Sequence, residues 1–155
     1  MSEIKEYQMY INNEFVEAED GKRFDSLNPE YNQPWASFPA ANTNDVNNAV
    51  QAAKEAFQEW SKLEVKERAK YLRAIGDQLF DNAEHIGSIE TIDSGKLLKE
   101  TKFQAQYMKE YFYYYAALVE EMSNEKIIKD IDKPDMEVVE VSESIGVIAC
   151  IIPCL

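Results

Sequence analysis

Apolar residues recur at three- and four-residue intervals from about residue 45 to residue 122, and this spacing predicts a run of four helices. The first is expected over residues 45–60, with Thr43 or Asn44 as its cap. The second is expected at about residues 64–80, and the third over residues 83–93 with Gly95 just beyond its end.

The fourth predicted helix is the longest and covers about residues 99–122. Its large apolar residues share one helical face, and this face is predicted to point inward. The face consists of Phe103, Tyr107, Tyr111, Tyr114, Tyr115, Leu118 and Met122.

Short β-prone runs precede the helices. Residues 9–11 and 14–16 surround Asn12-Asn13, and because asparagine tolerates a positive φ, we expect a tight hairpin. Residues 23–27 form a second extended piece. Prolines within and just before residues 30–41 exclude a regular helix, so this stretch is predicted to be extended and to lie over another surface.

The pattern changes again after residue 124. Residues 137–143 are β-branched and charged, which is typical of an edge strand. Residues 145–152 are continuously apolar, which is typical of a parallel strand buried on both faces. Such a strand needs neighbouring strands and covering helices, and three residues follow it. We therefore expect an α/β fold in which a sheet is begun and not finished.

This order suggests three parts. Residues 1–124 form an N-terminal hairpin and helical part, residues 125–144 include the edge strand, and residues 145–155 hold the first strand of an incomplete sheet.

Composition and charge narrow the class of function. The 155 residues carry 16 Lys and Arg against 29 Asp and Glu, a net charge of -13, which disfavours nucleic acid and anionic membranes as partners. The longest apolar stretch, residues 145–155, is shorter than the roughly 20 residues of a membrane helix. The N-terminus is unlike a signal peptide, and the two cysteines are not a disulfide framework, so a cytoplasmic location is expected.

Candidate chemistry is sparse. The five glycines are not spaced as a dinucleotide fingerprint or a P-loop requires. His85, Cys150 and Cys154 lack zinc-site spacing, and we interpret His85 as solvated or partly packed. In a strand the two cysteines would lie roughly 13 Å apart, too far for a disulfide, which favours buried, unreactive thiols. The tyrosines at residues 111 and 113–115 could stack on the bases of single-stranded nucleic acid, or they could belong to a helix that is packed on several sides. The negative net charge of the chain favours the packed helix.

Three segments resemble the aldehyde dehydrogenase superfamily, in order and spacing. Residues 11–16, Ile-Asn-Asn-Glu-Phe-Val, look like its opening hairpin, and the helix over residues 45–60 continues the match. Residues 90–96, Glu-Thr-Ile-Asp-Ser-Gly-Lys, are similar to its Glu-Thr-x-Asp-x-Gly-Lys signature. Residues 145–153 resemble the first strand of its cofactor-binding sheet.

The resemblance implies the N-terminal part of an enzyme that uses NAD or NADP. The backbone of Ile152, Pro153 and Cys154 matches positions that border this cofactor. In the family the strand leads into Pro-Trp-Asn, whereas Cys154 and Leu155 stand at the last two positions here. The nucleophilic cysteine, the general-base glutamate and the cofactor-binding lysine lie downstream. The resemblance therefore assigns no catalytic residue to this chain, and we expect no cofactor to be bound by it alone.

Two further features follow from the resemblance. Asp93, with carbonyls near Ser26 and Leu27, matches a monovalent-cation site of some members; the alternative is an ordinary residue of a helix C-terminal turn. Residues 126–144 match part of the family's oligomerisation hairpin, which pairs with another subunit by strand addition.

Three hypotheses about function remain. In the first, the chain is an N-terminal piece of an enzyme that oxidises an aldehyde to a carboxylic acid, and is inactive alone. In the second, it is a non-catalytic interaction module that joins a homo-oligomer or is completed by a complementing chain. In the third, it is a complete small helical protein whose apolar end packs on its own helices.

Overall fold

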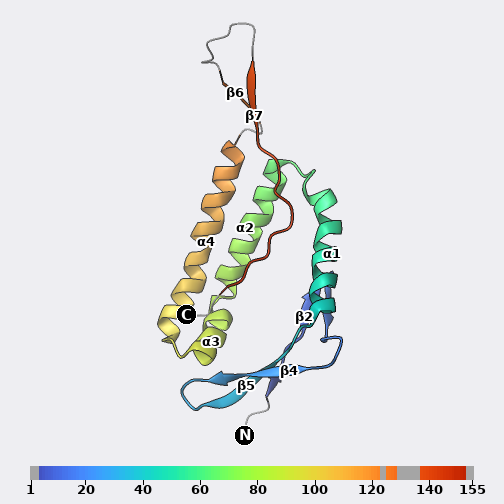
Figure 1. The fold of residues 1–155 in the computed structure, drawn as a ribbon. Coiled ribbons are helices and arrows are strands. Elements are labelled where there is room, and N and C mark those ends of the chain that lie inside the picture. The colour runs from blue at the N-terminus through green and yellow to red at the C-terminus, as the bar shows by residue number, and fades with distance from the viewer. Residues whose placement is uncertain (1–3, 123–124, 129–136, 153–155) are drawn as a thin grey trace.

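The computed structural model of the chain describes residues 4–122, 125–128 and 137–152. Short strands gather at one end of four helices, and a hairpin projects from the other end (Figure 1). The structure confirms the mixed α/β class and the order of small strands, four helices and strands. Within the described ranges, no helix has the length and apolar character needed to cross a membrane.

Five short strands build the N-terminal end. They are β1 (Lys5–Glu6), β2 (Met9–Ile11), β3 (Glu14–Val16), β4 (Arg23–Asn28) and β5 (Gln33–Pro39). Strands β2 and β3 form the predicted hairpin, in which Asn12 and Asn13 have φ values of 52° and 64°. The proline-rich stretch is extended as predicted and also pairs: β5 lies antiparallel to β4 and parallel to β1.

The four helices are close to their predicted positions. They are α1 (Thr43–Trp60), α2 (Val65–Asp81), α3 (Ala83–Ser94) and α4 (Leu98–Glu121). Helix α1 is capped by Asn42 and not by Thr43 or Asn44 as predicted: the Asn42 side chain accepts from the amides of Asn44 and Asp45, and Asp45 accepts from the Asn42 amide. This capping box satisfies amides that the helix start leaves free. Helix α3 ends at Gly95, whose φ of 75° is left-handed.

Helices α2 and α4 lie side by side and are joined by small residues and charges (Figure 1). A Cβ on Gly76 would lie 3.1 Å from the Cβ of Phe112, so the helices approach closely there. At the surface, Tyr113 and Lys109 contact the Asp77 carboxylate at 2.9 and 2.7 Å.

A second charged pair ties the same helices together. Both guanidinium ends of Arg73 donate to Glu120, at 2.8 and 2.7 Å. The hydrogen bonds from Arg73 lower the pKa of the Glu120 carboxyl. The pKa of Asp77 is lowered mainly by the hydrogen bond from Lys109 and to a smaller extent by the one from Tyr113.

The prediction for the inner face of α4 is wrong. Its large apolar residues are exposed; Phe103 and Tyr114, for example, have exposed fractions of 62% and 63%. The buried residues of α4 are instead Thr101, Ala105 and Ala116. Their small side chains let the neighbouring helices come close, whereas a row of aromatic rings would hold them apart. Across the described residues, every fully buried hydrophobic side chain is an alanine.

The C-terminal part agrees with the prediction at the edge strand and departs from it after residue 141. Strands β6 (Glu125–Ile128) and β7 (Val138–Val141) pair antiparallel as a hairpin, the second close to the predicted edge strand. Residues 142–152, however, contain no strand. The expected buried strand does not form, because no described strand lies beside it to complete its hydrogen bonds. Cys150 is exposed, which corrects the expectation of a buried thiol.

Candidate functional site

The predicted site residues lie in two places. Asp93 is near the end of α3, and the predicted cofactor border is at the end of the extended segment of residues 142–152. In that border Ile152 is 82% exposed, whereas Pro153 and Cys154 lie outside the described residues. An apolar groove lies between this segment and α1, and neither Asp93 nor its neighbours Ser26 and Trp35 line it.

A bulge between β4 and β5 places two donors on Asp93. Ser26 is opposite Ala36 but Leu27 is opposite Pro34, so Trp35 is an extra residue in β5. Such a bulge re-aims the side chain that it contains. The Trp35 indole Nε1 donates to Asp93 Oδ1 at 3.0 Å, and the Ser26 hydroxyl donates to the same oxygen.

The turn after Asp93 is held in place from both sides. Gly95 has a left-handed φ, and a Cβ at this position would lie 2.9 Å from Pro29 Cγ. Lys96 reaches back to the Glu90 carboxylate at 2.9 Å. The turn that leads from α3 to α4 therefore packs closely against Pro29, in the connection between β4 and β5.

Asp93 provides a half-buried carboxylate near irregular backbone of a sheet edge. One carboxylate with a single hydroxyl beside it suits a weakly held cation better than a divalent ion, which usually has several acidic ligands. Within residues 4–122, 125–128 and 137–152, no three His, Cys, Asp or Glu side chains are grouped for a metal. The predicted carbonyl ligands lie on the strand that carries Ser26, whose hydroxyl already contacts the carboxylate.

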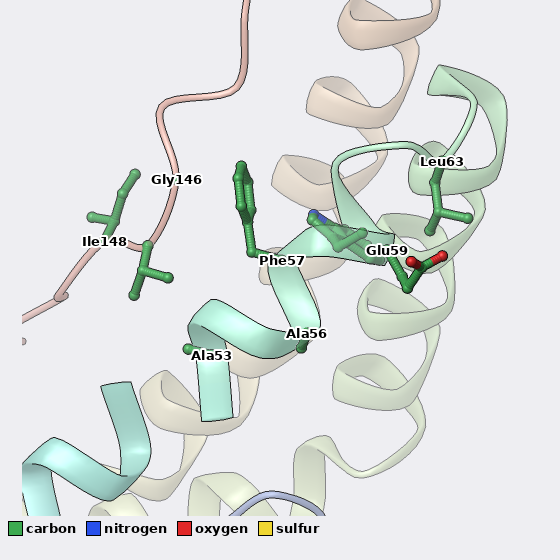
Figure 2. Close-up of a pocket in the computed structure, with 9 residues that line it drawn as sticks. Ala53, Ala56, Phe57, Glu59, Leu63, Gly146 and Ile148 are labelled. Atoms are coloured by element: carbon green, nitrogen blue, oxygen red, sulfur yellow. The ribbon is translucent and has the colours of Figure 1, made fainter. Parts of the chain in front are cut away.

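A groove of about 710 Å³ separates α1 from the extended segment. Figure 2 shows the Phe57 ring standing between the helix and the stretch with Gly146 and Ile148. Ala53 and Ala56 form the floor on the helix side, and Glu59 is the one charged residue among the described lining residues. This groove is suited to apolar contacts, and its single carboxylate, Glu59, is paired with Lys62 at 2.8 Å.

The segment beside this groove is poorly covered. Ile145 and Ile151 have exposed fractions of 86% and 93%. Gly146 has a φ of 107°, a value that glycine adopts without steric cost. The segment thus presents apolar side chains and unpaired strand-like backbone to its surroundings.

The sequence predicts Asp93 as a site residue but does not predict the side-chain hydrogen bonds that Trp35 and Ser26 donate to it. Trp35 stands in a proline-rich stretch and gave no periodic signal, because a one-residue bulge is invisible in spacing. The family resemblance predicts that a backbone carbonyl near Ser26 is a cation ligand, whereas in the structure the Ser26 hydroxyl donates to the Asp93 carboxylate. His85 is exposed, as predicted.

A sequence profile of the aldehyde dehydrogenase family matches residues 15–154 of this chain. The chain is 40% identical over 153 residues to (Z)-2-((N-methylformamido)methylene)-5-hydroxybutyrolactone dehydrogenase of Acinetobacter baylyi, covering 97% of this chain and 30% of that protein. It is 32% identical over 151 residues to human mitochondrial 10-formyltetrahydrofolate dehydrogenase, covering 95% of this chain and 16% of that protein.

A solved structure is similar over most of the fold. Betaine aldehyde dehydrogenase from Staphylococcus aureus, in complex with NAD+, superposes with a TM-score of 0.79 at 30% sequence identity. The similarity covers 88% of this chain and 27% of that one. The chain therefore spans less than a third of the length of each of these relatives.

Proposed function

The chain belongs to the aldehyde dehydrogenase family, and from this premise we propose that its 155 residues are the N-terminal scaffold of an NAD(P)-dependent enzyme. That enzyme oxidises an aldehyde to a carboxylic acid. The scaffold is inactive until further polypeptide supplies the catalytic cysteine, glutamate and asparagine. The observation that carries the proposal is the alignment: it uses 97% of this chain but 30% of its Acinetobacter relative.

The exposed surface supports the need for more polypeptide. The chain exposes 12585 Å², whereas a compact monomer of its mass exposes about 8,000 Å². The excess of roughly 4,500 Å² is more than one partner buries in most permanent complexes, about 1,000–2,500 Å². Exposed aromatic rings on α4 and isoleucines at residues 145–152 contribute to it. Exposed large apolar side chains that gather on one element are typical of an interface.

The proposed cofactor border consists of Ile152, Pro153 and Cys154. Of these the structure describes Ile152, which is exposed. A dinucleotide needs a turn and a helix N-terminus for its phosphates. We therefore assign these three residues one edge of a cofactor site, whose phosphate-binding turn and helix further polypeptide would supply.

Asp93 is the proposed ligand of a monovalent cation, together with carbonyl oxygens of the Ser26–Leu27 region. The bulge and the half-buried carboxylate support this assignment. Trp35 donates to the same carboxylate, so its fluorescence reports on the site. In a Trp60→Phe background, we expect KCl to change Trp35 emission more than choline chloride does at equal ionic strength. A response that is identical in Asp93→Asn would refute the assignment.

The proposal of inactivity is tested by assaying the purified chain with NAD+ or NADP+ and aliphatic, aromatic and quaternary-ammonium aldehydes. We expect no reduced nicotinamide above the rate of a boiled sample. Turnover at a rate typical of full-length family members would overturn the proposal. Circular dichroism of the same sample checks that the four helices are formed.

A second candidate function is a non-catalytic interaction or oligomerisation module. The projecting β6–β7 hairpin and the unpaired backbone of residues 142–152 favour it, because exposed strands accept further strands. Its partners are a second copy or a complementing chain. A dilute, monodisperse monomer with little dye-accessible apolar surface would count against it.

Mass spectrometry of the native protein separates these candidates. An antibody against this chain is expected to capture a longer polypeptide that contains these residues, if they are the scaffold of one enzyme. If the chain is an interaction module, the antibody is expected to capture the 155-residue chain itself, in a stoichiometric complex with its partner. Deleting residues 144–155 tests the third hypothesis, a complete small protein: the deletion should unfold that protein but should increase the solubility of a scaffold.

A further inference from the structure

We draw no further inference here: the strongest candidate, the row of exposed aromatic rings along α4 formed by Phe103, Tyr107 and Tyr111, is an unpartnered apolar face, and nothing in the described part of the structure shows what covers it.

Discussion

Gly87→Ala is expected to destabilise the chain, although alanine is normally the better helix residue. Gly87 lies in α3 where this helix crosses α4. A Cβ on it would lie 2.7 Å from the Lys102 amide nitrogen and 2.8 Å from Lys102 Cα. Both are backbone atoms, so no side chain can rotate away, and the two helices must separate by several tenths of an ångström.

The separation also stretches a buried contact. Thr101 is fully buried, and its hydroxyl lies 2.9 Å from the Gly87 carbonyl oxygen and 2.9 Å from the Thr91 hydroxyl. Overpacking costs about 1–3 kcal/mol, and the helix propensity of alanine offsets about 1 kcal/mol of this. We expect a net loss of up to about 2 kcal/mol, or a fall in Tm of up to about 8 °C for a chain of this size.

Urea unfolding followed by circular dichroism measures this loss. His85→Ala and His85→Gly provide the matched control, because His85 is exposed on the same helix. There alanine should be the more stable variant by about 1 kcal/mol. A Gly87→Ala variant that is also more stable than the parent chain would refute the close approach of α3 and α4.

Three further predictions concern the helices. Thr101→Val removes a buried hydroxyl at nearly constant volume and should cost about 1–3 kcal/mol in unfolding free energy, whereas Thr101→Ser should retain the hydrogen bond. Asn42→Ala removes the cap of α1 and should lower the unfolding free energy by about 1 kcal/mol, with Asn42→Ser close to the parent. The pKa values of Asp77 and Glu120 are depressed in the folded chain, so their stabilisation is present above the ordinary values of 3.8 and 4.5 and is lost as the pH falls through the folded values. The urea midpoint should fall in that acid range, and Asp77→Asn with Glu120→Gln should make the fall shallower; an unchanged pH profile would contradict the pairing.

Local signals predicted most of the fold. The asparagine pair of the first hairpin, the glycine after α3 and the helical spacing of α1 and α2 depend on near neighbours, and all correspond to observed elements. The face of α4 was mispredicted, because spacing identifies an apolar stripe but not the partner that covers it. In the described structure the neighbouring helices approach the opposite face, at Ala105 and Ala116. The pairing of β5 with β4 and β1 also depends on contacts distant in sequence.

The candidate site divides in the same way. Asp93 was found because it belongs to a contiguous signature, residues 90–96. Trp35 and Ser26 lie 58 and 67 positions away from it in sequence, and only the folded bulge brings them together. The strand predicted at residues 145–152 is not formed, since hydrogen bonds between strands need a second strand and none is described beside it. Apolarity predicts where such a strand belongs but does not supply its neighbours.

The large exposed surface, with alanines as the buried hydrophobic residues of the described part, has a calorimetric consequence. Unfolding raises the heat capacity, and the increase grows with the apolar area that becomes hydrated. With 12585 Å² already exposed, the chain hides only about three-quarters of the area that a compact protein of its mass hides. Its unfolding endotherm should therefore be broad, with a heat-capacity step reduced in a similar proportion. Any polypeptide that covers the exposed rings and isoleucines should sharpen the transition and restore the step.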